Sequence, residues 1–283
     1  MHSTLVSTTE LAAHLSTWIV IDCRFDLRDE AAGRRAYRES HIAGAAYASL
    51  SEDLSGPLTG TNGRHPLPTV ESMEATFSRL GIGRGTQVVA YDADSGMYAS
   101  RLWWMLRYVG HDAVAVLDGG WAAWSREKRP VSGGDEHHAP QAFTAAVRPQ
   151  MRVDAGSMAE LVTSGSARLV DARAPERYEG RTEPIDRIPG HIPGAVNHFF
   201  KRNVTPEDTM RPADELRAEL APIVGDRNPK DVVMYCGSGV TACQNLLALE
   251  HAGIRGVRLY PGSWSEWSAD PARPVETGPR ESR

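Results

Sequence analysis

Cysteine is scarce in this chain, and long apolar runs and an excess of positive charge are missing. The 283 residues include only three cysteines, Cys23, Cys236 and Cys243. This odd, widely spaced set is not a disulfide framework and favours a reducing cytoplasm. No run of about 18 apolar residues predicts a membrane span, and the N-terminus does not read as a secretory signal. The net charge of -5 argues against a nucleic-acid partner. We therefore expect a cytoplasmic protein without a membrane or nucleic-acid partner.

The two halves of the sequence carry the same motifs in the same order. "WIVIDCR", "HIAGAAY" and "VVAYDADSG" in the first half correspond to "ARLVDAR", "HIPGAVN" and "VVMYCGSGV" in the second. Such self-similarity indicates a duplicated domain. The predicted domains span residues 1–131 and 151–283. Residues 132–150 are rich in Gly, Pro and charge and are predicted to be an exposed linker.

Each half alternates short β-branched runs with helix-like segments. "VVAY" (88–91) and "VVMY" (232–235) are continuous apolar runs, typical of strands buried on both faces. Residues 101–109 and 242–252 have helical spacing, and a glycine follows each where a C-cap glycine belongs. This alternation predicts the α/β class, with two tandem domains that each contain a parallel sheet and helices on both faces.

Cys236 stands where a predicted strand ends and a glycine-rich turn begins. Gly237 and Gly239 permit a tight turn whose N–H groups point inward, and a helix is predicted to start near Thr241. Backbone amides and a helix N-terminus stabilise anions, so a thiolate here is a candidate nucleophile. The alternative is a small, buried and inert core cysteine. We assign that structural role to Cys23 and to Cys243, which lies about two helical turns beyond Cys236.

Together, the duplicated halves, "GHIPGAVN", "DLSGPLTGTNGRHPLP", "CGSGVT" and "YPGSWSEW" resemble the two-domain rhodanese-type sulfurtransferases over nearly the whole chain. The "CGSGVT" loop is most similar to that of the 3-mercaptopyruvate sulfurtransferases. The resemblance implies a first domain without a nucleophile, and Asp92 stands where Cys236 stands in the second half. It also implies that loop residues bind the substrate, namely Gly237, Gly239, Val240 and Thr241.

The cysteine loop has three alternative interpretations. A cysteine phosphatase needs an arginine six residues after the cysteine, and Ala242 occupies that position. Thiosulfate is a dianion, whereas the loop residues Gly237 to Gly239 carry no charge. A neutral loop favours the monoanionic 3-mercaptopyruvate as donor, with thiosulfate second. A non-catalytic sulfur-binding module is the third alternative.

Other side chains are predicted to complete the site. The resemblance implies that Arg177 and Arg187 bind the substrate carboxylate, because a guanidinium pairs with a carboxylate through two hydrogen bonds. It also implies that Ser238 and His65 assist proton transfer. The family has an acidic residue where Ser51 stands, so either Asp53 or Glu52 replaces it or the proton relay is incomplete. The repeated histidines, His41 and His191, and Arg173, paired with Asp171, are predicted to hold the fold.

The expected reaction is a double displacement. Cys236 takes sulfur from the donor as a persulfide and passes it to a thiol such as thioredoxin or glutathione, or to cyanide. The expectation includes no metal and no organic cofactor. His137 and His138 are only an adjacent pair, which is not a metal site without further ligands. A monomer is expected, because a duplicated chain can pack its own halves together.

Overall fold

A computed structural model describes residues 1–279, so the last four residues of the predicted second domain lie outside the described chain. The chain divides into two compact units, neither of which is continuous in sequence. Unit 1 contains residues 1–56, 68–148 and 204–210. Unit 2 contains residues 57–67, 149–203 and the chain from 211 onward. Each unit therefore incorporates a short segment from the opposite half of the sequence.

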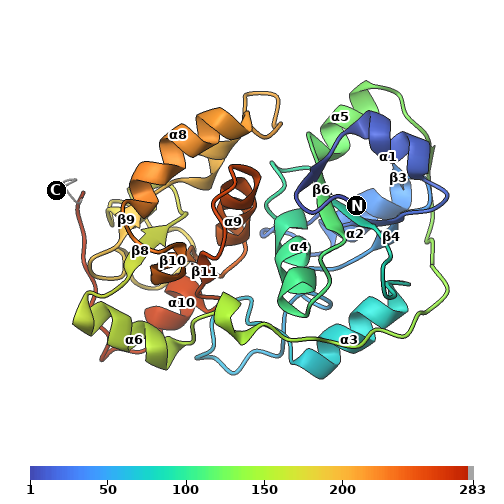
Figure 1. Cartoon of the computed structure of the whole chain (residues 1–283). Coiled ribbons are helices and arrows are strands. Elements are labelled where there is room, and N and C mark those ends of the chain that lie inside the picture. The colour runs from blue at the N-terminus through green and yellow to red at the C-terminus, as the bar shows by residue number, and fades with distance from the viewer. Residues whose placement is uncertain (280–283) are drawn as a thin grey trace. The chain divides into compact units, whose positions relative to one another are not determined.

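Unit 1 is built on a parallel sheet of five strands in the order β1-β6-β5-β2-β4, with a small antiparallel pair, β3 and β7 (Figure 1). Its elements along the chain are β1 (Leu5–Val6), α1 (Thr8–His14), β2 (Ile19–Asp22), α2 (Ala32–Glu39), β3 (His41–Ile42), β4 (Ala46–Tyr47), α3 (Val70–Arg79), β5 (Val88–Tyr91), α4 (Ala99–Tyr108), β6 (Val114–Leu117), α5 (Gly120–Arg126) and β7 (Val131–Ser132).

Unit 2 is built on a parallel sheet of four strands in the order β11-β10-β8-β9. Its elements along the chain are η1 (Pro149–Met151), α6 (Ala155–Ser164), β8 (Arg168–Asp171), α7 (Pro175–Tyr178), β9 (Val196–Asn197), η2 (Phe200–Asn203), α8 (Ala213–Val224), η3 (Pro229–Asp231), β10 (Val232–Tyr235), α9 (Thr241–His251), β11 (Arg258–Leu259) and α10 (Ser263–Trp267).

Both sheets are covered on both faces, as the sequence predicts. Every residue of β5 and of β10 is buried, and successive side chains of a strand point to opposite faces. In unit 2, Met158 of α6 and Trp264 of α10 pack against one face of the sheet together with Val233 and Tyr235. Helices α8 and α9 lie on the opposite side (Figure 1). The predicted α/β class with parallel sheets is confirmed.

Local predictions for the central strands and helices hold closely. The predicted strands 88–91 and 232–235 coincide with β5 and β10. Helix α4 begins two residues earlier than the predicted 101–109, and helix α9 begins one residue earlier than the predicted 242–252. Each helix ends one residue earlier than predicted. Gly110 and Gly253 follow these helices with φ of 91° and 80°, the left-handed conformation that ends a helix at low cost only for glycine.

The duplicated polar residues hold the fold in both units. Asp22 and Asp171 end equivalent strands, and each pairs with the arginine two residues later at 2.7 Å. His41 and His191 are fully buried and stack on the ring of a tyrosine, Tyr37 and Tyr178, while Nδ1 of each donates to that tyrosine's carbonyl. These contacts confirm the structural roles predicted for both histidines and for Arg173.

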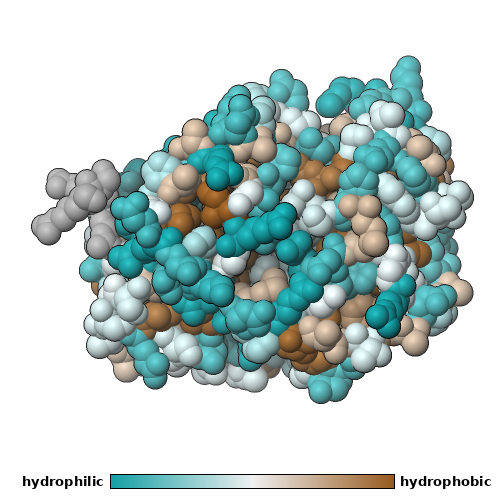
Figure 2. Space-filling model, viewed as in Figure 1, coloured by the Kyte–Doolittle hydropathy of each residue, from teal (hydrophilic) through white to brown (hydrophobic). Residues whose placement is uncertain are grey.

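The protein surface drawn in Figure 2 is mainly hydrophilic, with separate apolar patches. Few large apolar side chains are exposed in the described chain, and those that are lie mainly in loops, such as Leu58 and Ile185. Scattered exposed apolar residues are normal for a globular protein and do not by themselves mark a binding surface. Candidate sites must therefore be sought in the loops at the strand ends.

Candidate active site around Cys236

Cys236 directly follows β10, at the carboxyl end of a central parallel strand. Its side chain is folded into the loop, and the residue is only 1% exposed. The N–H of Gly239 donates to Sγ over a distance of 3.1 Å. Helix α9 then begins at Thr241, so the loop connects the strand end to a helix N-terminus. This geometry places the sulfur where backbone amides stabilise negative charge.

Gly239 is required by the path of the loop. Its φ is 73°, and a Cβ at this position would lie 2.1 Å from the carbonyl oxygen of Pro261. No other residue type fits without moving the backbone. The close approach holds the Gly239 N–H in position to donate to the cysteine sulfur.

The start of α10 fixes the other side of the loop. The N–H groups of Trp264 and Ser265 donate to the carbonyls of Cys236 and Gly237, at 3.0 and 2.9 Å. Ser263 has a φ of 55°, and its Oγ accepts from the Cys236 N–H at 3.1 Å. Sequence reasoning did not assign these three residues to the site. The sequence did contain a signal, because "SW" at 263–264 aligns with "GW" at 120–121 and the glycine in the first copy marks a position with a positive φ. In the structure the φ of Gly120 is 51°.

Ser238 and His65 are brought together as predicted. Nδ1 of His65 lies 2.8 Å from Oγ of Ser238, and both residues are buried. His65 belongs to the segment 57–67, which comes from the first half of the sequence but is part of unit 2. A hydrogen-bonded serine and histidine in and against the cysteine loop can carry a proton to or from a reacting group.

Two arginines converge on the residue after the cysteine. A Cβ on Gly237 would lie 3.0 Å from Nη2 of Arg64 and 3.6 Å from both terminal nitrogens of Arg177. The carboxylate of Asp186 accepts from both arginines, at 2.5 Å from Arg64 and 2.9 Å from Arg177. The sequence predicts that Arg177 binds the substrate carboxylate, which stays a prediction, whereas Arg64 was missed. Its only sequence signal was that it precedes His65 in "GRHPLP".

Arg187 is exposed, and no described contact joins it to the loop. Its predicted role in binding the carboxylate stays a prediction. The exposed Arg181 pairs with Glu179 at 2.5 Å.

Ser51 and the two candidates for the missing acidic residue, Glu52 and Asp53, lie in unit 1 and have partners there. Ser51 donates to Glu30 at 2.8 Å, and Glu52 pairs with Arg34 at 2.6 Å. Asp53 pairs with Arg79 and also accepts from the backbone N–H of Ser49 at 2.8 Å. Which residue, if any, supports His65 stays an open prediction.

The other two cysteines differ from Cys236 in their surroundings. Cys243 is fully buried in α9, and its Sγ donates to the Gly239 carbonyl at 3.3 Å. Cys23 follows β2, where burial, with a contribution from Asp22, raises the pKa of the thiol well above its usual value. A thiol held in its neutral form is a poor nucleophile. Cys236 is equally buried, so burial alone does not separate the three cysteines, and the structural roles of Cys23 and Cys243 stay predictions.

In unit 1, the loop equivalent to the cysteine loop is closed by a carboxylate. Asp92 is buried, and its two oxygens accept from four backbone N–H groups, those of Asp94, Gly96, Tyr98 and Ala99, at 2.8–3.0 Å. Burial raises the pKa of Asp92 to about 6, although the four amides oppose this shift. The Asp92 carboxylate therefore occupies the backbone N–H groups that could otherwise bind an anion in this turn of unit 1.

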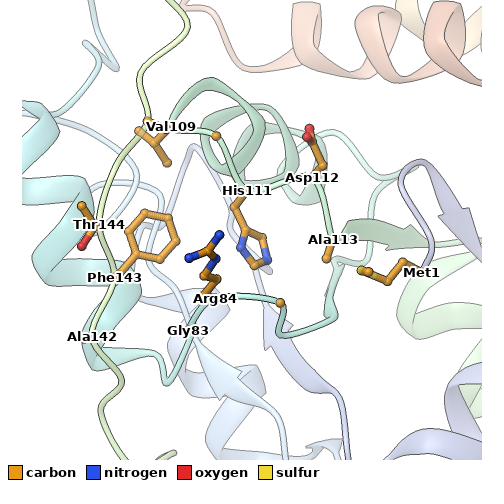
Figure 3. Close-up of a pocket in the computed structure, with 13 residues that line it drawn as sticks. Met1, Gly83, Arg84, Val109, His111, Asp112, Ala113, Ala142, Phe143 and Thr144 are labelled. Carbon is orange, nitrogen blue, oxygen red and sulfur yellow. The ribbon is translucent and has the colours of Figure 1, made fainter.

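Two cavities of unit 1 are alternative candidate sites. One, of about 350 Å³, lies beside the Asp92 loop and includes Arg28, which follows the strand-ending aspartate by six residues, as Arg177 does in unit 2. The other, of about 710 Å³, is lined only by unit 1 residues. Figure 3 shows its Arg84 side chain between the rings of Phe143 and His111. Neither cavity contains a cysteine, so neither offers the chemistry of Cys236.

Within residues 1–279, no group of three or more His, Cys, Asp or Glu side chains is arranged to hold a metal ion. In the same part of the chain, no helix has the length and apolarity needed to cross a membrane.

Comparison with known proteins gives consistent matches. The Rhodanese-like domain family matches residues 7–127 and 154–270. A Pseudomonas aeruginosa protein named "Probable 3-mercaptopyruvate sulfurtransferase" is 41% identical over 97% of this chain and 98% of its own length. The human 3-mercaptopyruvate sulfurtransferase is 40% identical over 83% of this chain and 79% of its own. The solved structure of 3-mercaptopyruvate sulfurtransferase from Leishmania major superposes with a TM-score of 0.84 at 30% identity, covering 94% of this chain and 74% of that one.

Proposed function

The chain belongs to the Rhodanese-like domain family and is a sulfurtransferase with two such domains, and from this premise we propose that it transfers sulfur from 3-mercaptopyruvate through a persulfide on Cys236. The observation that carries the proposal is the position of Sγ, which accepts the Gly239 N–H inside the loop between β10 and α9. Of the three cysteines, only Cys236 lies in a turn of this kind. The proposed compartment is the reducing cytoplasm, in which its thiol stays available.

In the first half-reaction, the Cys236 thiolate attacks the sulfur of 3-mercaptopyruvate. The S–C bond breaks, and its electron pair leaves on carbon as the enolate of pyruvate. A proton, delivered by Ser238 and His65 or by the new persulfide itself, converts the enolate to pyruvate. Cys236 keeps the sulfur as a persulfide, whose negative charge the loop amides stabilise.

In the second half-reaction, a thiolate acceptor attacks the outer sulfur of the persulfide. The S–S bond breaks, and its electron pair returns to Cys236 as the thiolate. Thioredoxin and glutathione are the proposed thiol acceptors, and cyanide serves in an assay, in which it gives thiocyanate. Because the donor product leaves before the acceptor reacts, the kinetics should be ping-pong. We propose that the protein acts as a monomer without a metal or organic cofactor.

Thiosulfate is the second candidate donor, and one observation favours it. The loop residues are uncharged, but the guanidinium groups of Arg64 and Arg177 lie against Gly237. The neutral-loop argument for 3-mercaptopyruvate therefore does not describe the whole site. Attack on thiosulfate would break its S–S bond and release sulfite, leaving the same persulfide.

The proposal is tested with Cys236→Ser and the matched control Cys243→Ser. We expect pyruvate release and thiocyanate formation to be lost in Cys236→Ser, because a hydroxyl cannot carry the sulfur, and to be retained in Cys243→Ser. Mass spectrometry of the wild type after exposure to donor should show one added sulfur atom at residue 236. Equal turnover in wild type and Cys236→Ser would remove Cys236 as the nucleophile.

A further inference from the structure

Arg64 stands at the end of a row of alternating charges in unit 2. The row runs Asp171, Arg173, Glu183, Arg177, Asp186, Arg64, with successive partners 2.5–3.1 Å apart. The side chains of Glu183 and Asp186 are only 3% and 6% exposed. Such desolvated charges hold one another in fixed positions. The row therefore ends with a fixed cation, and this cation lies beside Gly237 in the cysteine loop.

The hydrogen-bonding capacity of Arg64 is only partly used. Its Nη1 donates to Asp186, whereas its Nε is buried and has no hydrogen-bond partner in the described chain. A guanidinium has five N–H donors in a fixed, planar arrangement. A buried donor without an acceptor is unfavourable and is rare in folded proteins. An acceptor atom from a ligand would complete the hydrogen bonding of Arg64.

The backbone fixes Arg64 independently of its side chain. The Arg64 N–H donates to Oγ of Ser265 at 3.0 Å, and Ser265 in turn donates its own N–H to the Gly237 carbonyl. Arg64 and the cysteine loop thus share one anchor at the start of α10. The backbone of Arg64 is therefore held against the cysteine loop by two successive hydrogen bonds through Ser265.

From these contacts, and resting on the proposed function, we propose that Arg64 binds the anionic group of the sulfur donor together with Arg177, and that it determines how well the dianionic thiosulfate is used relative to the monoanionic 3-mercaptopyruvate. Attraction between charges scales with their product, so Arg64 favours the donor with two negative charges. Asp186 opposes this effect because its carboxylate occupies both guanidinium groups. The donor preference is set by this pair rather than by the neutral loop alone.

The test compares Arg64→Gln, Arg64→Lys and Asp186→Asn with the control Arg181→Gln, which alters an exposed arginine that pairs with Glu179. The readouts are kcat/KM for pyruvate release from 3-mercaptopyruvate and for thiocyanate formation from thiosulfate. Arg64→Gln should lower kcat/KM roughly 30-fold for thiosulfate and roughly 5-fold for 3-mercaptopyruvate, mainly through KM. Arg64→Lys should retain a donor ratio close to that of the wild type, because it keeps the charge.

Asp186→Asn should shift the donor ratio in the opposite direction, towards thiosulfate, because it removes a competing negative charge. Arg181→Gln should leave both values unchanged. If Arg64→Gln changes both donors by the same factor, or neither, the inference is overturned while the proposed sulfur transfer stands.

A binding measurement separates the inference from the proposed function. In a Cys236→Ser background, calorimetry should show that thiosulfate binds roughly 10-fold more weakly when Arg64 is also changed to Gln. Equal binding in the two proteins would overturn the inference even if the wild type proved inactive with both donors. Conversely, weaker binding together with an inactive wild type would support Arg64 as an anion-binding residue and refute the proposed reaction.

Discussion

Replacing Gly239 with alanine tests whether the cysteine loop depends on one close backbone approach. A Cβ would lie 2.1 Å from the Pro261 carbonyl oxygen, whereas real Cβ atoms essentially never approach another atom more closely than 3.0 Å. The backbone at Gly239 and the backbone at Pro261 must therefore separate by about 0.9 Å. The left-handed φ of 73° adds about 1 kcal/mol of strain. Separation also endangers the hydrogen bonds from Trp264 and Ser265 to the loop carbonyls, each worth about 1 kcal/mol.

These contributions, with about 1 kcal/mol for the overpacking itself, amount to roughly 4 kcal/mol. Gly165→Ala is the matched control, because Gly165 also has a left-handed φ, 62°, but nothing lies within 4 Å of its Cβ position. The control should lose only about 1 kcal/mol.

Urea unfolding measures both losses. The difference of about 3 kcal/mol corresponds to roughly 6–12 °C in Tm for a protein of this size. Pyruvate release should fall at least about 10-fold in Gly239→Ala only, because Sγ loses its amide donor. If the two variants lose equal stability and keep equal activity, the reasoning is refuted.

Two further predictions concern the arginines and the loop of unit 1. Arg177→Gln should raise the KM for 3-mercaptopyruvate roughly 10-fold, and the same change at Arg187 shows whether that exposed residue binds the carboxylate; no effect at Arg177 would refute its assignment. The second prediction concerns Asp92, whose pKa is raised to about 6, so the folded state binds its proton more tightly than the unfolded chain does. Protonation of Asp92 therefore stabilises the fold fully below about pH 4, and this stabilisation is lost as the pH rises through 6. The free energy of unfolding of wild type minus that of Asp92→Asn should therefore decrease between pH 4 and 7 in urea unfolding; an unchanged difference would contradict the raised pKa.

The sequence alone determined the α/β class and the duplication, and it marked Cys236 as the candidate nucleophile. The runs at 88–91 and 232–235 match β5 and β10 because continuous apolar residues have few alternatives to a strand buried on both faces. Gly237 and Gly239 marked the loop after Cys236 because such turns need glycine, a local requirement. Signals of this kind depend on neighbouring residues and so can be read along the chain.

Only the tertiary structure decided which distant side chains contact the cysteine loop. The segment 57–67 joins unit 2, which brings His65 to Ser238 and Arg64 to Gly237 across more than 170 positions in sequence. A charged residue in a loop carries no local signal of its partner, because a pairing over such a separation depends on how the whole chain packs. For the same reason Arg187 was named from the sequence and Arg64 was not considered, although the structure places Arg64 beside the cysteine loop and leaves Arg187 exposed.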